Sequence, residues 1–405
     1  MSELKKDAVQ ESVIDKSKTQ GVSRRKFLKA AGAALVLVAT GGIFQAYDNG
    51  VFSTGEGLAY EPWKDWRRKE EGPLNMVRAA ILASNPHNTQ AWLFHVTGNQ
   101  IDLYVNKKRH HGAADPLMRE MYIGAGCALE NMLLAARAEG YTADFVIMPN
   151  TANDTHVAHI VLSPGKKDTS PLYNAIPNRH TNRYAYTSRK VKQEGLDSLT
   201  VLADDMDDVR VVWLTDQGDM KRFSNLTIEA TKAFIEDQGQ SKASYAWNRS
   251  DWGEVQRLRD GITLDAAGLP DLVLLAAKML PESSRQQVDN AWLNSMQNTQ
   301  LPTAAAFGLV VARNAFNKAQ QVKGGMLWQR LHLQMTVDRL AAQPINVAAE
   351  RRDREIQLGL DHSIGSNLSK IIGDEKWQVI NPFRIGYPTR EPNLSPRRGV
   401  KDALI

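Results

Sequence analysis

The stretch GAGCALENMLLAARAEG (124–140) carries the clearest structural signal in this sequence. Its apolar residues Leu129, Met132, Leu133 and Ala136 recur at the spacing of one face of an α-helix. We therefore predict a long helix over 125–139. Cys127 lies within it and is the only cysteine of the chain, so no intramolecular disulfide can form. We interpret this thiol as a small buried core residue rather than a redox centre.

Strand patterns flank this helix on both sides. Upstream, FHVTG and QIDLYVN alternate apolar and polar residues around a Thr-Gly-Asn turn, which predicts a β-hairpin over about 94–105. Before the hairpin, an amphipathic helix begins near Pro73 and stops at Asn85-Pro86, because proline disfavours helix in its predecessor. Downstream, ADFVIMP and HVAHIVLS predict two more strands. This order predicts an α+β fold, with helices packed on an antiparallel sheet.

A second unit begins near Pro171. We predict a helix that starts at Asn178, a strand at VRVVWLT (209–215) and a long helical region after Asp216. Farther along, two further patterns predict a helix that ends at Gln343-Pro344 and a closing strand: WQRLHLQMTVDRLAA (328–342) and QVINPFRIGYP (378–388).

The chain therefore divides into an N-terminal segment, a polar connector and two α+β units: 1–47, 48–72, 73–170 and 171–405. Within the second unit, residues 245–305 are rich in Gln, Asn, Ser and Trp and have weaker periodicity. We expect a helical insertion or lid there. The two units share a loose plan without obvious sequence repetition.

The N-terminus has the pattern of an export signal, and a basic helix start that leads into a buried helix is the alternative interpretation. SRRKFLK (23–29) places paired arginines directly before the uncharged run 30–47, and this is the address read by the twin-arginine translocase of bacteria. We expect a protein exported to the periplasm or to the outer face of the inner membrane, folded around a cofactor acquired beforehand. Phe44 lies where a small-x-small cleavage site would have its first small residue, before Ala46. An uncleaved membrane anchor formed by residues 30–47 is therefore an alternative.

The charge balance argues against nucleic-acid binding. Residues 1–29 contain eight Lys or Arg and four Asp or Glu, so they account for most of the net charge of +5. The remainder is close to neutral, and the basic isoelectric point reflects the targeting segment rather than a nucleic-acid footprint.

Two short segments carry side chains suited to ligand binding. NPHNTQAW (85–92) joins a helix to a strand, and its Asn88 and Gln90 can offer both donors and acceptors to a planar heterocycle beside Pro86. RHTNR (179–183) gathers two arginines and a hydroxyl, a set that suits a bound anion at the start of a helix. A polar capping loop and a solvated basic turn are the alternative interpretations. Two arginines of the C-terminal tail can add cationic contacts, Arg397 and Arg398.

Together these segments resemble the FMN-dependent nitroreductase family, and more closely its exported or dormancy-associated branch, in which two nitroreductase-like halves are fused. The resemblance covers roughly residues 73–400. NPHNTQAW resembles the flavin-facing loop Pro-Ser-x-x-Asn-x-Gln-Pro-Trp, and RHTNR is similar to the phosphate grip Arg-Arg-Ser-x-Arg. Three further segments match later parts of the family pattern in the correct order: the long helix at 124–140, the helix at 328–342 and FRIGYP.

This sequence departs from the family pattern at four positions. In the loop, His87 replaces serine and Ala91 replaces proline; in the grip, His180 and Thr181 replace arginine and serine. The first half has the loop without an upstream grip, whereas the second half has the grip without the loop. The resemblance therefore implies one complete FMN site per chain, an empty second pseudo-site, and a monomer that acts as a pseudo-dimer.

The resemblance also implies roles for individual residues. The phosphate grip would consist of Arg179, Thr181 and Arg183, helped by Arg397 or Arg398. The ring would face Pro86, Asn88 and Gln90 on one side, with three residues on its other edge: Pro344, Ile345 and Asn346. The flavin performs the redox step in such proteins, so we assign no catalytic acid or base.

Metal binding and hydrolysis are weaker hypotheses. His156 and His159 lie in a predicted strand, where an offset of three residues directs side chains to opposite faces, so we assign no metal ligand. No Gly-x-Ser-x-Gly turn is present in the sequence.

Two functions stay open at this point. The first is a reductase that passes electrons from NAD(P)H or an envelope donor to a nitroaromatic or quinone-like acceptor. The second is a protein that binds or sequesters FMN with little turnover, with residues 245–305 blocking substrates.

Overall fold

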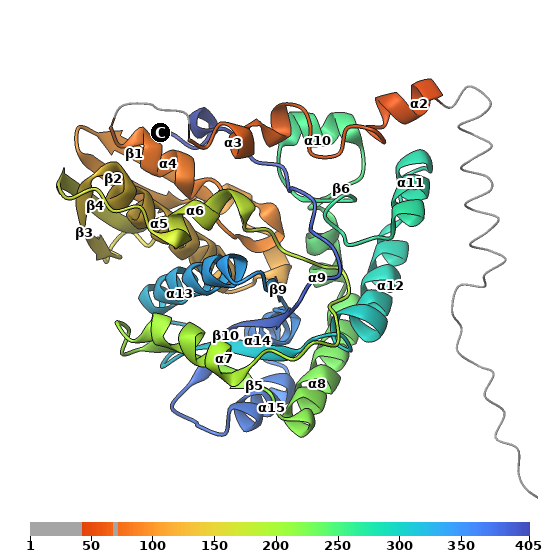
Figure 1. The fold of residues 1–405 in the computed structure, drawn as a ribbon. Helices are drawn as coiled ribbons and strands as arrows, with labels where there is room; N and C mark the ends of the chain where they lie inside the picture. The colour runs from red at the N-terminus through yellow and green to blue at the C-terminus, as the bar shows by residue number, and fades with distance from the viewer. Residues whose placement is uncertain (1–42, 68–71) are drawn as a thin grey trace, which may run out of the picture.

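The computed structural model describes residues 43–67 and 72–405 and shows two four-stranded antiparallel sheets with a pair of long helices packed together (Figure 1). The fold is mixed α+β with antiparallel sheets flanked by helices, as the sequence predicts. The twin-arginine stretch at 23–29 lies outside the described residues. Within the described part, no helix is both long enough and apolar enough to span a membrane.

The first sheet confirms the hairpin and the two later strands. Its strand order is β1-β2-β4-β3, and the hairpin register pairs Trp92 with Val105. The alternation in β2 buries Ile101, Leu103 and Val105 under α5 and leaves Asp102 on the other face. The elements of this half are α4 (Leu74–Ala80), β1 (Trp92–Thr97), β2 (Gln100–Val105), α5 (Arg119–Glu139), β3 (Tyr141–Ile147) and β4 (His156–Pro164).

The second sheet repeats the topology of the first. Along the chain it is built from two strands, a long helix and two strands, and its order β5-β8-β10-β9 corresponds position by position to β1-β2-β4-β3. The closing strand is confirmed as β10. The strands and the helix are β5 (Val209–Leu214), β8 (Ala306–Ala312), α13 (Lys318–Val337), β9 (Ala341–Pro344) and β10 (Gln378–Gly386).

The helices α5 and α13 cross at a pair of glycines. A Cβ at Gly126 would lie 2.0 Å from the carbonyl oxygen of Val322, and a Cβ at Gly325 would lie 2.0 Å from that of Ile123. The contact is reciprocal, as in an interface between two equivalent subunits. Cys127 lies beside this crossing, is 1% exposed, and has its Sγ 3.2 Å from the carbonyl oxygen of Gly325.

The second half carries two helical insertions that the first half lacks. One lies between β5 and β8 and includes the predicted insertion at 245–305, which is mainly helical with two short parallel strands. The other follows β9. The elements are α8 (Gln217–Glu236), α9 (Gln238–Tyr245), β6 (Asn248–Arg249), α10 (Trp252–Leu258), β7 (Ile262–Thr263), α11 (Asp271–Met279), α12 (Arg285–Ser295), α14 (Val347–Leu358) and α15 (Ser363–Ile372).

Each half ends in an arm that crosses to the other half. After α6 (Pro171–Ala175), the chain reaches the second sheet, where Asn182 N–H donates to the carbonyl of Ala342 in β9. It then enters α7 (Gln193–Thr200). The C-terminal tail returns to the first sheet, where Phe94 N–H donates to the carbonyl of Ala403. The arms bring residues 179–187 and 388–405 across the junction between the halves.

Two sequence predictions are wrong in this region. The helix expected to begin at Asn178 does not exist, because the short turn at Ile176–Asn178 ends there and Arg179 is extended (φ −80°, ψ 104°). The arm pairs with the second sheet instead, and this tertiary pairing outweighs the local preference for a helix. The helix expected to reach Ala342 ends at Val337, since Arg339 takes a positive φ of 57° and Ala341–Pro344 form β9.

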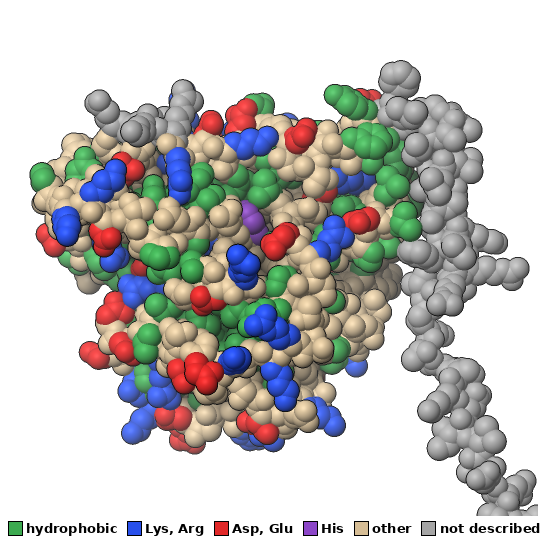
Figure 2. Space-filling view, in the orientation of Figure 1, with side chains coloured by type: hydrophobic (Ala, Val, Ile, Leu, Met, Phe, Trp, Pro, Cys, Tyr) green, Lys and Arg blue, Asp and Glu red, His purple; other side chains and the backbone are tan. Residues whose placement is uncertain are grey.

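The connector before the first half packs on the body. It follows α2 (Ile43–Asp48), which ends the N-terminal segment, and contains α3 (Glu61–Lys64); Trp63 and Trp66 are only 5% and 8% exposed. Figure 2 shows Lys/Arg and Asp/Glu side chains interspersed over the visible face, which agrees with the near-neutral charge of the chain beyond the N-terminal segment.

Candidate functional site

The loop between α4 and β1 has a strained backbone. His87, Asn88 and Gln90 all have positive φ angles of 46°, 53° and 51°. Non-glycine residues adopt this conformation rarely, and clusters of such residues persist where surrounding contacts hold them, often at functional sites. This loop is the segment in which the sequence predicts flavin contacts.

The C-terminal arm holds the amides of this loop. Asn88 Nδ2 donates to the carbonyl of Pro396 at 2.8 Å, and Asn88 Oδ1 accepts from Arg397. Gln90 Oε1 accepts the backbone N–H of Arg398 at 2.8 Å, and its Nε2 donates to the carbonyl of Arg259 at 2.8 Å. The tail and the insertion therefore fix the loop, and Pro86 lies half-buried at its start.

Two arginines from the two arms meet at the end of α4. Arg179 Nη2 donates to the carbonyl of Leu82 at 3.1 Å, and Arg397 Nη2 donates to the carbonyl of Ala83 at 3.3 Å. These carbonyls belong to the turn that follows α4, which ends at Ala80. Sequence analysis predicts both arginines as ligand-binding residues, and the structure brings them together although they lie far apart in the chain.

These arginines have no acidic partner. Among residues 43–67 and 72–405, neither Arg179 nor Arg397 forms an ion pair with a carboxylate, yet they are only 2% and 3% exposed. Burial lowers the pKa of Arg179 to about 10, and burial together with Arg179 holds the pKa of Arg397 well below its usual value. The Nε atoms of both guanidiniums and Nδ1 of His180 are buried without a hydrogen-bond partner.

Aromatic rings and a second histidine enclose this pair. Arg397 lies over the ring of Trp63 at 4.8 Å, and His180 makes an edge contact with the same ring at 4.6 Å. Arg179 Nη1 lies 3.3 Å from His332 Nδ1 of α13. Burial lowers the pKa of His180 to about 3, so this ring is neutral at physiological pH and the arginines carry the positive charge. We call Arg179, His180 and Arg397 the buried cation cluster.

The other residues of the predicted grip lie apart from this cluster. In the extended arm, Arg183 donates through Nη1 to the carbonyl of Ala266 at 3.0 Å, and burial lowers its pKa to about 10. Thr181 is half-buried. The side chain of Arg398 donates to the carbonyl of Asp402, and its Nη1 is buried without a partner. The helical turn that would group Arg179 with Arg183 is absent.

The residues expected at the other edge of the ring follow β9. Pro344 ends that strand, and Ile345 is 3% exposed and packs in the core of the second half. Asn346 begins α14, and its Oδ1 is buried without a hydrogen-bond partner. A polar atom in this state is available to a ligand.

The sequence did not reveal a buried group of acids beneath the loop. His87 stacks near His111 at a ring distance of 4.6 Å, and His111 Nε2 lies 3.7 Å from Glu120. Glu120 hydrogen bonds to Glu350 of α14, and burial raises the pKa of Glu120 to about 7 despite the nearby Arg119. These residues come from separate elements, so no spacing in the sequence marks them.

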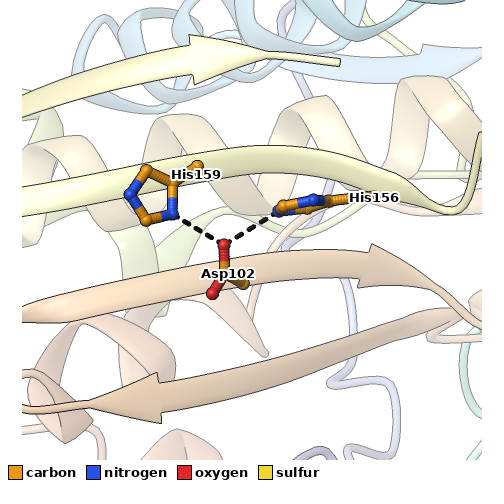
Figure 3. A group of neighbouring side chains, drawn as sticks. All are labelled: Asp102, His156 and His159. Carbon is orange, nitrogen blue, oxygen red and sulfur yellow. Dashed lines mark hydrogen bonds and ion pairs between the residues drawn. The ribbon is translucent and has the colours of Figure 1, made fainter. Parts of the chain in front are cut away.

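The prediction that His156 and His159 point to opposite faces is wrong. Tyr104 pairs with His156 whereas Leu103 pairs with Ala158, so Val157 is an extra residue in β4. Such a β-bulge shifts the alternation by one residue and places both histidines on the same face. His156 Nε2 and His159 Nδ1 lie 2.8 and 2.7 Å from Asp102 Oδ1 (Figure 3).

A cavity of about 310 Å³ lies away from the loop and the buried cation cluster. It is enclosed by α14, α15 and the start of β10, and its lining includes Phe316, Arg352 and His362. None of the residues predicted to bind flavin lines it.

Comparison with known proteins gives a consistent picture. A segment of 114 residues is 31% identical to a Mycobacterium tuberculosis protein named as an NAD(P)H nitroreductase. A second M. tuberculosis protein with that name is 33% identical over 88 residues. The chain is similar to nitroreductases. The matches span 28% and 22% of this chain and about a third or less of the relatives, 33% and 27%.

Solved nitroreductases overlap with part of the structure at low TM-scores. The FMN-dependent nitroreductase NfnB from Mycobacterium smegmatis, solved with NADPH, is 14% identical, has a TM-score of 0.37, and is matched over 57% of this chain and 96% of its own. A nitroreductase with bound FMN from Desulfitobacterium hafniense is 13% identical with a TM-score of 0.36, over 59% of this chain and 98% of its own. No family model matches the sequence.

Proposed function

We propose that this protein is an FMN-binding oxidoreductase of the nitroreductase type, built from two fused nitroreductase-like halves and exported to the cell envelope. The observation that carries the proposal is the buried cation cluster, whose two arginines lack an anionic partner beside the strained loop. The similarity to nitroreductases and the repeated sheet topology support it.

The residues of the cluster fit the phosphate of FMN. An unpaired buried cation is costly, and an anion that accepts from it removes the cost. The free Nε atoms of Arg179 and Arg397 are available donors. Each is buried, so a phosphate there would form charge-assisted hydrogen bonds in a weakly polar environment.

The remaining roles follow from this placement. We propose that Arg398, Thr181 and Arg183 contribute at the periphery of the phosphate. The loop residues Pro86, Asn88 and Gln90 would face the isoalloxazine ring, with Pro344, Ile345 and Asn346 along its other edge. Bound FMN would supply two-electron redox chemistry, and the protein residues would bind and orient it.

The acceptor we propose is a nitroaromatic or a quinone-like molecule, and the donor is NAD(P)H or a reductant of the envelope. The partner in export would be the twin-arginine translocase, and residues 30–47 would either be cleaved or anchor the protein.

A second candidate function is flavin sequestration with little turnover. The insertion favours it, because it contacts the proposed site directly. Arg259 accepts from Gln90, Gly261 N–H donates to the carbonyl of Asn88 at 3.3 Å, and Ala266 accepts from Arg183. A segment held over the loop in this way can exclude substrates from a flavin.

Two measurements test these proposals. The visible spectrum of the purified protein should show oxidised flavin, and a colourless protein that takes up no added FMN would overturn the FMN site. Stopped-flow mixing with NADPH, NADH and a quinol should then bleach the flavin with at least one donor. Bound flavin that no donor reduces would favour sequestration over reduction.

A further inference from the structure

The outer face of the first sheet gathers imidazoles around a single carboxylate. Asp102 of β2 pairs in register with His95 of β1 and with His159 of β4, so the three side chains form a row across adjacent strands. The bulge at Val157 adds His156 to the same face. This face lies opposite the one that packs on α5, and the three histidines and Asp102 are partly exposed.

The side-chain atoms that could bind a metal ion lie close together around the Asp102 carboxylate. Asp102 Oδ1 lies 2.8 Å from His156 Nε2 and 2.7 Å from His159 Nδ1, and Figure 3 shows both rings directing a nitrogen toward that carboxylate. His95 Nδ1 lies 3.8 Å from Asp102 Oδ2. Among the described residues, no Lys or Arg forms an ion pair with Asp102, so its charge faces imidazoles alone.

We propose that Asp102, His156 and His159 bind a zinc-class divalent ion, with His95 or water in the fourth position. Two imidazoles and a carboxylate with one open position form a donor set that zinc uses in proteins. Neutral imidazoles and one carboxylate would leave the occupied site with a single positive charge on a solvent-accessible surface.

Zinc binding would require each ligand atom to shift. Ligand atoms around tetrahedral zinc lie about 3.3 Å apart, which follows from bond lengths of about 2.0–2.1 Å. The two imidazole nitrogens would therefore each move about 0.5 Å away from Asp102 Oδ1. The ring of His156 is already oriented by stacking on Tyr104 at 4.6 Å, and all three ligand atoms lie within 4.8 Å of one another.

A hydrogen-bonded cluster that never takes up metal is the competing explanation, because each imidazole can donate to the carboxylate. The two explanations differ in what they predict for zinc uptake. They also differ in the effect of Asp102→Asn, which preserves a hydrogen-bond acceptor but replaces a zinc-binding carboxylate oxygen with a much weaker ligand.

The test uses the full chain, purified with a tag that contains no histidine and stripped with EDTA. Titration with zinc chloride at pH 7.5, followed by calorimetry, should saturate at one zinc per chain in the micromolar range. Asp102→Asn and the double variant His156→Gln/His159→Gln should each weaken binding at least about tenfold, since even outer-shell changes cost 10–100-fold. His362→Gln, which removes an exposed histidine elsewhere, should bind like the parent.

Two further readouts separate binding here from binding elsewhere. Zinc should raise the melting temperature of the parent and of His362→Gln but not that of Asp102→Asn. X-ray absorption of the loaded parent should show nitrogen and oxygen ligands at about 2.0–2.1 Å with imidazole scattering. A parent that takes up no zinc overturns the proposal. So does a double variant with parental affinity, which would place the ion at another group such as His111, Glu120 and Glu350.

Discussion

At the scale of single residues, the site is defined by polar groups that lack partners. Arg179, His180 and Arg397 each bury an atom without a hydrogen bond, whereas the equally buried Arg384 satisfies its guanidinium with neutral acceptors such as Gln343 Oε1 and the carbonyl of Gln300. Burial alone therefore does not mark a ligand-binding arginine. The proposed phosphate site rests on the combination of burial, charge and an unused donor at Arg179 and Arg397.

The first prediction concerns the two arginines and rests on the proposed FMN site. Replacing Arg179 or Arg397 with Ala should remove a charge-assisted contact of about 1.5–3 kcal/mol, which lowers FMN affinity by about 10- to 100-fold. Riboflavin lacks the phosphate and should bind parent and variants alike. Fluorescence titration of each ligand measures both quantities.

Two other variants serve as comparisons for this titration. Arg390→Ala removes an arginine whose partner is the exposed Asp271, at 2.7 Å, so FMN affinity should not change. Arg183→Ala should have a smaller effect than Arg179→Ala, because its guanidinium is engaged with Ala266. Parental FMN affinity in both Arg179→Ala and Arg397→Ala would show that the phosphate lies elsewhere.

The second prediction concerns stability in acid. Burial and the neighbouring arginines lower the pKa of His180 to about 3, whereas the unfolded state keeps an ordinary value near 6.5. Between these values the unfolded state binds more protons, so stability falls as pH drops below about 6.5. From pH 7 to 5 this group should cost up to about 2 kcal/mol.

Urea unfolding of the parent and of His180→Gln at both pH values measures this contribution. The difference between the two proteins should change by up to about 2 kcal/mol, with the parent losing more on acidification. Parallel pH dependence in the two proteins would mean that His180 is accessible to protons in the folded state.

At the scale of elements, the close crossing of α5 and α13 decides how the halves fit together. Gly126 and Gly325 each face a carbonyl oxygen of the opposite helix, so neither position has room for a side chain. Backbone atoms of a helix cannot give way as a flexible side chain can. The two helices contact each other in the same way, just as the two sheets have the same strand order.

The third prediction is that Gly126→Ala and Gly325→Ala each destabilise the protein by about 3 kcal/mol, the upper end of the range for overpacking. The control is Gly195→Ala in α7, where an added Cβ would meet only Val191 Cγ1 at 3.8 Å. That change should be neutral or stabilise the helix by up to about 1 kcal/mol. Midpoints of denaturant unfolding compare the three variants, and equal midpoints would contradict the close crossing.

At the scale of the whole molecule, the two halves have the same sheet topology but differ in the segments added to it. The strained loop belongs to the first half, whereas the insertion between β5 and β8 belongs to the second. The arms exchanged between the halves supply Arg179 and Arg397 to one place, at the end of α4. We propose that this asymmetry gives the chain one ligand site rather than two.

The fourth prediction follows from this asymmetry and from the proposed function. Titration of the stripped protein with FMN should saturate at about one FMN per chain, because residues 43–67 and 72–405 contain one strained loop and one buried cation cluster. Spectroscopic titration together with protein quantification gives the ratio. Two FMN per chain would show that the second half completes a site of its own.

The fifth prediction tests export. Arg24→Lys with Arg25→Lys should leave folded, flavin-loaded protein in the cytoplasm, since we propose that the export receptor reads the paired arginines and these residues lie outside the described fold. Cell fractionation with flavin absorbance reports both location and loading. An unchanged periplasmic yield would contradict the twin-arginine hypothesis.

The sequence by itself determined the elements whose periodicity is local. The helix around Leu129 and the hairpin at 94–105 follow from the spacing of their apolar residues. It missed β8, because the continuous apolar run AFGLVVA has no alternation when both faces are buried. It also missed α14 and α15.

Only the tertiary structure decided what depends on distant contacts. Arg179 is extended because its arm pairs with the second sheet, and it meets Arg397 because the tail returns to the first. The bulge at Val157 places His156 beside His159, although the spacing alone predicts opposite faces. The two histidines share a face, and the two arginines share a site, because backbone pairing between remote segments sets their positions and local spacing does not record that pairing.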